Sequence, residues 1–132
     1  MRFSGFYELL SHWAEHAADA PALRFERNGA IGTCTCSELF DRVTKRAEVL
    51  KKDRKQAYGI LSDGSFDCVI EIFASVLSGR RTVLLSENAS DETLLEQVRE
   101  AELDALWGDS DLKKLLRPAL VETAEGGILE PW

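Results

Sequence analysis

Apolar residues along this chain recur at two different spacings, and the change between them separates the expected elements. Spacings of three and four residues with charged residues opposite predict amphipathic helices, whereas short apolar runs between turn residues predict strands. Besides a long helix discussed below, helices are expected at 6–17, 66–77, 90–101 and 112–116. Strands are expected at 22–27, 31–35, 57–61, 82–85, 105–107 and 119–121.

Two local motifs sharpen the N-terminal part of this prediction. Asn28-Gly29 stands between two alternating runs, which is the strongest short-range signal for a β-hairpin. Thr35 and Glu38 have the spacing of a capping box, in which each side chain accepts a hydrogen bond from the other residue's backbone. We therefore expect the long helix to begin at Thr35, with an apolar stripe that reaches Leu50.

From residue 57 onward strands and helices alternate with short links, which is typical of a parallel sheet with right-handed crossovers. The predicted fold class is α/β: three layers, with a mostly parallel sheet of about four strands and helices on both faces, plus an N-terminal helix and hairpin. The chain is expected to be a single unit, 1–132. Within it, 1–35 holds the helix and hairpin, 36–122 the sheet region, and 123–132 a trailing loop.

Length and charge exclude several classes of function. The 132 residues are enough for one domain, and the net charge of −7 argues against a general binder of nucleic acid or anionic membranes. Residues 1–86 carry 12 basic and 11 acidic groups, whereas residues 87–132 carry 4 and 12. The basic residues between Lys45 and Lys55 fall mostly on one helix face without interleaved aromatic residues, so we interpret them as a solvated face.

No targeting segment is expected, and the predicted location is the cytoplasm. Ala18-Asp19-Ala20 resembles a signal-peptidase site, but the stretch before it contains charged residues and lacks an apolar core. No run approaches the ~20 apolar residues of a membrane-spanning helix. Cys34, Cys36 and Cys68 have no disulfide-scaffold spacing, which favours free thiols in a reducing compartment.

Two short motifs contain residue types that bind metals. His12, Glu15 and His16 match an H-x-x-E-H pattern, and residues four apart share one helix face, so a metal site is one interpretation. The pattern lies on the flank of an amphipathic helix, which favours a solvated face instead. Cys34-x-Cys36 supplies only two thiols where structural zinc requires four ligands, so packing is the favoured interpretation.

Other candidates for chemistry also have simpler structural interpretations. The turn from Ser62 to Ser65 joins a strand to a helix, where phosphates bind in some α/β folds, but it lacks the glycines and lysine of phosphate loops. Asp63 and Asp109 each follow a strand, as in phosphoacceptor receivers, but the candidate lysines Lys113 and Lys114 lie within a helix. No nucleophile set can be assembled. Phe66, Ile70 and Phe73 are interpreted as core residues.

Taken in order, short phrases over residues 7–121 resemble the N-terminal segment of the AMP-forming acid–thiol ligases, the adenylate-forming superfamily of acyl-CoA synthetases. The phrases are Pro21-Ala22-Leu23, Thr35-Cys36-Ser37-Glu38-Leu39, Ser62 to Asp67, Ser78-Gly79, Arg81 to Leu85, and Leu95 to Trp107. The chain departs from the superfamily pattern at Cys36, where Tyr is usual, at Ser62 and Gly64, which replace Pro and Ser, and at Ser86, which replaces Pro.

The resemblance implies a parent enzyme that activates a carboxylic acid with ATP to an acyl-adenylate and transfers it to a thiol such as CoA. ATP, magnesium and CoA would be its cofactors. The Ser/Thr/Gly-rich phosphate loop, the magnesium and AMP contacts and the catalytic lysine of that superfamily lie in later segments, and none of these motifs occurs here. We therefore assign no catalytic, cofactor-binding or metal-binding residue in this chain, and expect the chain alone to be non-catalytic.

The implied partners are the remainder of the ligase polypeptide and, for the parent, a small carboxylic acid. Apolar surface left by the missing part could also drive self-association. A different class of protein stays open as the alternative: a stand-alone α/β binding or scaffold module derived from such an enzyme, whose acidic second part binds a basic partner.

Overall fold

The computed structural model describes residues 5–120, which form two compact units. Of these residues, the first unit comprises 5–52 and 65–78, and the second comprises 53–64 and 79–120. The elements run in the order α1 (Phe6–His16), β1 (Pro21–Arg27), β2 (Ala30–Thr35), α2 (Cys36–Lys52), β3 (Ala57–Ser62), α3 (Phe66–Ser78), β4 (Arg81–Ser86), α4 (Asp91–Glu100), β5 (Ala105–Trp107), α5 (Ser110–Leu116) and the short 3₁₀ helix η1 (Arg117–Ala119).

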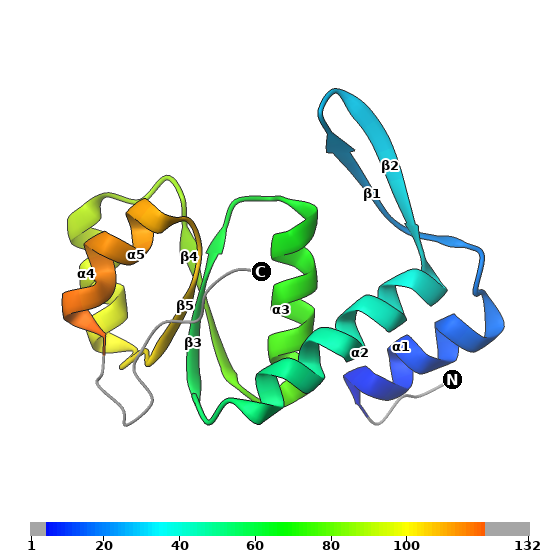
Figure 1. Ribbon diagram of the computed structural model, residues 1–132, viewed down its shortest axis with the longest axis horizontal. Helices are drawn as coiled ribbons and strands as arrows, with labels where there is room; N and C mark the ends of the chain where they lie inside the picture. The colour runs from blue at the N-terminus through cyan, green and yellow to red at the C-terminus, as the bar shows by residue number, and fades with distance from the viewer. Residues whose placement is uncertain (1–4, 121–132) are drawn as a thin grey trace. The chain divides into compact units, whose positions relative to one another are not determined.

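In the first unit, β1 and β2 form the antiparallel hairpin that the sequence predicts (Figure 1). Asn28 and Gly29 have φ values of 53° and 79°, and two left-handed residues in a two-residue loop are the mark of a type I′ turn. Phe25 lies opposite Gly32, and a Cβ on Gly32 would stand 2.5 Å from the Phe25 ring. Gly32 therefore leaves the space that the Phe25 ring occupies across the hairpin.

The capping box at the start of α2 is also confirmed. The backbone N–H of Glu38 donates to Thr35 Oγ1 at 3.2 Å, and the backbone N–H of Thr35 donates to Glu38 Oε1 at 3.3 Å. These reciprocal bonds satisfy donors that a helix N-terminus otherwise leaves unpaired. The buried residues of α2 follow helical spacing along one face: Leu39, Val43, Ala47 and Leu50.

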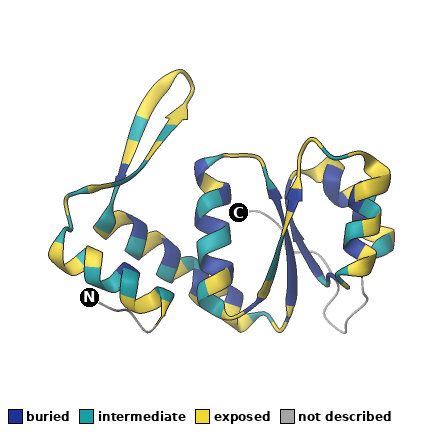
Figure 2. Ribbon diagram, turned by 180° about the vertical axis from the view of Figure 1, so that it is seen from behind, coloured by how far each residue is buried: buried dark blue, intermediate teal, exposed yellow. Residues whose placement is uncertain are grey.

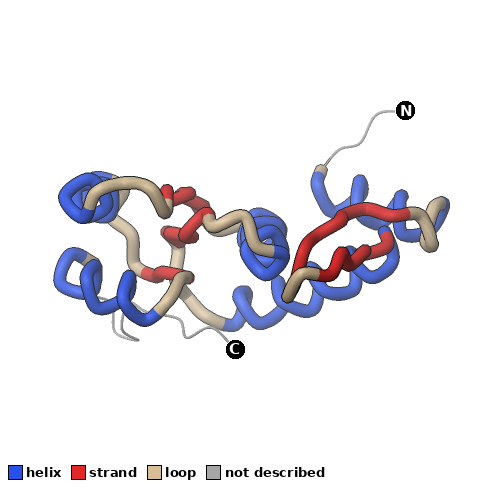
Figure 3. Tube along the Cα trace, turned by 90° about the horizontal axis from the view of Figure 1, so that it is seen from above, coloured by secondary structure: helices blue, strands red, loops and turns tan. Residues whose placement is uncertain are grey.

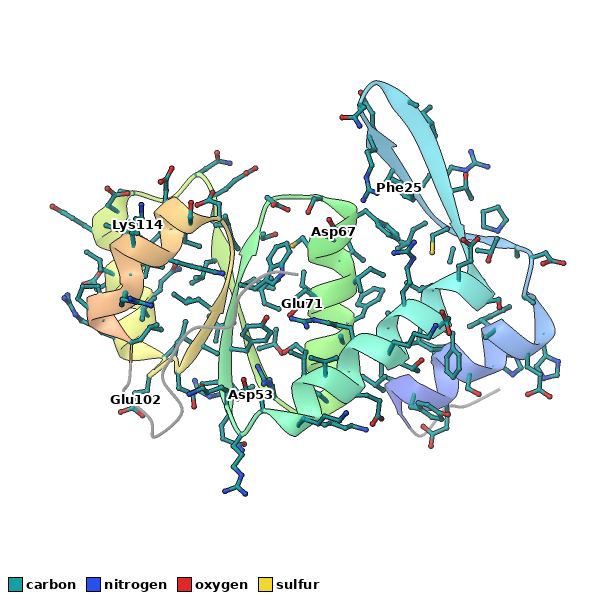
Figure 4. All side chains as sticks on the ribbon, in the orientation of Figure 1. Phe25, Asp53, Asp67, Glu71, Glu102 and Lys114 are labelled. Carbon is teal, nitrogen blue, oxygen red and sulfur yellow. The ribbon has the colours of Figure 1, made fainter. Side chains whose placement is uncertain are left out.

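A buried ion pair joins α2 to α3 within this unit. The Arg46 guanidinium donates from Nε to Glu71 Oε1 at 2.7 Å and from Nη2 to Oε2 at 2.9 Å. The Glu71 side chain, labelled in Figure 4, has no exposed surface, and that of Arg46 is 13% exposed. A bidentate geometry of this kind offsets the cost of removing both charges from water.

The second unit is built on a parallel sheet with strand order β4-β3-β5. Residues Ala57 to Leu61 of the central strand β3 are all buried, as expected for a parallel strand covered on both faces (Figure 2). The Asp104 carboxylate accepts from the backbone N–H groups of Gln56 at 3.1 Å and Ala57 at 2.9 Å. This side chain therefore ties the start of β3 to the residue that precedes β5.

Helices α4 and α5 lie side by side against one face of this sheet (Figure 3). Their inward residues Leu94, Val98, Leu112 and Leu116 join the core that β3 and β5 supply. Gly59 permits this packing, because a Cβ there would stand 2.5 Å from Leu103 Cδ1 and 3.0 Å from Leu106 Cδ2. Any larger residue on the central strand would push into side chains that are already closely packed.

The α/β class and the parallel sheet are confirmed, but one predicted element is wrong. Residues 117–119 form the 3₁₀ helix η1, with Pro118 near its start, where the sequence predicts a strand over 119–121. The described parallel sheet therefore has three strands, not about four. Proline has no N–H to give to a ladder and favours the first turn of a helix, which explains the difference. The trailing loop predicted at 123–132 lies outside the described residues.

Replacing Glu71 should reveal how much the buried ion pair contributes to stability. We expect Glu71→Ala to lower the free energy of unfolding by about 3 kcal/mol, because it leaves the largely buried Arg46 guanidinium without its carboxylate. Urea unfolding followed by circular dichroism measures this loss.

The exposed pair Lys45–Asp41, 3.0 Å apart on α2, is the matched control. Lys45→Ala should change the free energy of unfolding by no more than about 0.5 kcal/mol, since solvent screens that pair. Equal losses in the two variants would contradict the role assigned to Glu71.

Candidate functional site

The second unit has a cavity at the edge of the sheet where the parallel strands end. Its volume is about 430 Å³, and its floor contains leucines of β3, α4 and α5. Four carboxylates line it: Glu87, Asp91, Asp109 and Asp111. Among the described residues, the lining includes no lysine, arginine or histidine, so these carboxylates would repel the phosphates that bind at this edge in many α/β enzymes.

At each of the two helix N-termini near this cavity, one backbone donor already has a side-chain acceptor. Ser90 Oγ accepts from the N–H of Thr93 at 3.2 Å at the start of α4, and Asp109 Oδ1 accepts from the N–H of Leu112 at 2.8 Å at the start of α5. Helix N-termini bind anions through such donors when they are unoccupied. Here Ser90 and Asp109 each occupy one of these donors, and the carboxylates stabilise the helix dipoles.

The structure assigns capping roles to two groups of residues that the sequence analysis considered for chemistry. In the turn before α3, Ser65 Oγ accepts from the N–H of Cys68 at 3.1 Å, so this serine caps the helix. Asp109 caps α5 in the same way. Lys113 of α5 is buried and Lys114 is exposed. Within residues 5–120, no lysine lines the acidic cavity, in contrast to what a phosphoacceptor site requires.

His12 and His16 are brought together on α1, with ring centres 4.5 Å apart. Over residues 5–120, no group of three or more histidine, cysteine, aspartate or glutamate side chains is arranged to hold a metal ion. The pair therefore lacks the three protein ligands of a catalytic zinc site.

Cys34 and Cys36 differ in their surroundings, although one residue separates them. Cys34 is 2% exposed and its thiol donates to the Thr35 carbonyl at 3.6 Å, whereas Cys36 is partly exposed. Burial, assisted by the Glu38 carboxylate, raises the pKa of the Cys34 thiol above its ordinary value. Cys34 is therefore held in its inert protonated form at neutral pH, which favours a packing role.

The aromatic residues of α3 pack within the first unit. Phe66 is 7% exposed and stacks on Phe25 with ring centres 4.3 Å apart, and Phe73 meets Phe6 edge to face at 5.2 Å. Ile70 is also buried. These ring contacts and the burial support the interpretation of Phe66, Ile70 and Phe73 as core residues.

The first unit also has a groove of about 340 Å³. It is lined by Tyr7, Phe40, Thr44, Ala47, Glu48, Lys51 and Leu77.

Buried charges were the features that sequence reasoning missed. Glu71 is a charged residue within the apolar run of α3. That position was the only sign of its role in the sequence, since its partner Arg46 is 25 residues away. In the second unit the Arg80 side chain is 3% exposed, lies 3.9 Å from Asp53 and stands over the Tyr58 ring at 4.8 Å. Both arginines have structural roles in these contacts.

The difference between the cysteines predicts their reactivity. At pH 7.5, iodoacetamide should modify Cys36 at least roughly tenfold faster than Cys34, because the thiolate is the reactive form and burial disfavours it. Peptide mass spectrometry over a time course measures the two rates. Cys36→Ser should remove the fast phase; modification of Cys34 at the rate of Cys36 would contradict the inert role.

No family model and no curated protein matches this sequence. Solved structures do match it. The o-succinylbenzoate CoA synthetase MenE from Bacillus subtilis, in complex with the acyl-adenylate intermediate OSB-AMP, is 25% identical with a TM-score of 0.73. The match covers 92% of this chain and 30% of that one. The unliganded form of the same synthetase is 27% identical over 84% of this chain and 24% of that one, with a TM-score of 0.71.

A more distant enzyme has the same fold. The fatty acid AMP ligase from Legionella pneumophila is 13% identical with a TM-score of 0.69, over 82% of this chain and 20% of that one. The resemblance to the N-terminal segment of the adenylate-forming ligases is thereby confirmed. The chain spans no more than about a third of the length of these structures.

Proposed function

We propose that this chain is the N-terminal part of an AMP-dependent ligase that activates a carboxylic acid with ATP and transfers the acyl group to a thiol such as CoA. The observation that carries the proposal is the similarity to MenE over 92% of this chain. In the parent, ATP, magnesium and CoA would bind to residues outside these 132.

The chemistry of the described residues supports a structural role for this part of the ligase. The cavity at the carboxyl edge of the sheet is lined by carboxylates, and the nearby helix N-termini are capped by Ser90 and Asp109. A triphosphate would meet electrostatic repulsion there. We therefore infer that this chain alone does not form an acyl-adenylate.

Surface apolar residues support the existence of a larger partner polypeptide. Leu84 of the outer strand β4 is 52% exposed, and among the described residues β4 and β5 each pair only with β3. Val49, Val76 and Tyr7 are about half exposed in the first unit. The remainder of the ligase would cover such positions, since isolated outer strands and apolar side chains favour association.

Two further observations concern the cellular compartment of the protein. None of the helices formed by residues 5–120 has the length and apolar character needed to cross a bilayer. The three cysteines are free thiols, which fits a reducing compartment such as the cytoplasm.

ATP–pyrophosphate exchange tests the proposed function. The reading frame should be followed beyond Trp132, and both its full product and the 132-residue chain assayed with a panel of aromatic and fatty acids. We expect exchange from the full product and none from the short chain, because the phosphate loop and catalytic lysine would lie in the added part. Exchange by the short chain would overturn its non-catalytic status.

A stand-alone binding module is the second candidate, and the acidic cavity favours it. Its four carboxylates over a leucine floor would suit a lysine- or arginine-bearing segment of a partner. A stop codon directly after Trp132, with no exchange from the chain mixed with any neighbouring gene product, would select this module over the ligase part.

A further inference from the structure

Helix α1 carries two imidazoles one helical turn apart. His12 and His16 have ring centres separated by 4.5 Å, with ring planes tilted by 41°. His16 is exposed and His12 is half-buried, so the pair borders solvent. The proposed ligase activity assigns no role to this pair.

The spacing of the rings matches what one metal ion would impose. Imidazole nitrogens bind divalent transition ions at about 2.0–2.1 Å. Two rings on one ion, at a right angle or a tetrahedral angle, then have centres roughly 4.5–5.2 Å apart by that bond length. The observed separation of 4.5 Å lies at the lower end of this range.

The charges on this segment also favour a cation. Between residues 5 and 20 the chain carries Glu8, Glu15 and Asp19 and no lysine or arginine. A local negative potential raises the concentration of divalent cations near the imidazoles. Imidazole nitrogen selects zinc, copper and nickel ions over the hard magnesium and calcium ions, which prefer oxygen ligands.

We propose that His12 and His16 form a two-imidazole chelate for a divalent ion of the nickel, copper and zinc class on the exposed side of α1. Water completes the coordination, because the described residues supply no group of three protein ligands. An ion with two protein ligands and several waters exchanges readily, so this is a labile binding site and not a structural or hydrolytic zinc centre. It does not depend on the proposed ligase function, whose magnesium would prefer oxygen ligands.

Titration with Ni²⁺ alone tests the chelate. The chain is purified without a polyhistidine tag and carries Cys36→Ser, so that the accessible thiol does not compete. Isothermal titration calorimetry should detect one ion per chain. His12→Ala and His16→Ala should each weaken affinity by roughly tenfold to a hundredfold, since loss of either ring ends bidentate binding.

The controls separate chelation from general attraction and from unfolding. Glu15→Gln should weaken the affinity by no more than about twofold, because an exposed carboxylate that is not a ligand acts on the ion only through a potential that solvent screens. Alanine is the best helix former, so α1 should persist in both histidine variants, and far-ultraviolet circular dichroism checks this. An unchanged affinity in the double variant His12→Ala/His16→Ala would overturn the proposal, as would the absence of binding to the starting protein.

Trp13 supplies a second readout. Its ring centre lies 5.2 Å from that of His12, and the side chain is 47% exposed. Ni²⁺ bound at the pair should quench its fluorescence, and Trp13→Phe should remove this quenching while the calorimetric binding remains. Equal quenching in the variant that lacks both histidines would place the ion elsewhere and contradict the assignment.

Discussion

Strand β3 must be buried along both faces, and the second unit is organised around this requirement. Its residues from Ala57 to Leu61 are all removed from solvent, and it pairs with β4 on one side and β5 on the other. Gly59 lets Leu103 and Leu106 approach the strand backbone, so that α4 and α5 cover one face closely. A fully buried strand also needs its backbone groups paired, and the Asp104 carboxylate completes that pairing where the strand begins.

Several polar side chains among the described residues hold the backbone at helix N-termini. Ser90, Asp109 and Ser65 cap helices, and Thr35 and Glu38 cap α2 reciprocally. Such groups stand where other α/β proteins bind phosphates, at the carboxyl ends of strands and the N-termini of helices. Each cap at the cavity occupies one donor of its helix N-terminus and the lining carboxylates repel anions, so the described residues at this edge of the sheet disfavour a phosphate. This chemistry supports the proposal that the chain is a structural part of a larger ligase.

Local motifs were predictable because both partners lie within a few residues of each other. The type I′ turn at Asn28-Gly29 and the capping box at Thr35 depend on backbone geometry that those residues favour in any context. The prediction of a strand at 119–121 was wrong because its local signal was weak. A short apolar run has no periodicity to distinguish strand from helix, and Pro118 favours the start of η1. The hypotheses about His12, His16 and the cysteines could be stated from spacing alone, but not decided.

By itself, the sequence determined the α/β class, the order of the elements and the hairpin, because hydrophobic periodicity and turn chemistry are properties of short segments. The tertiary structure alone decided which charges are buried and what they meet. Arg46 and Glu71 are 25 residues apart, and only the packing of α2 on α3 makes them a bidentate pair. The cavity at the end of the sheet likewise gathers Glu87 and Asp109 from separate loops. Burial and long-range electrostatics depend on the positions of all neighbours in space, which no local pattern specifies.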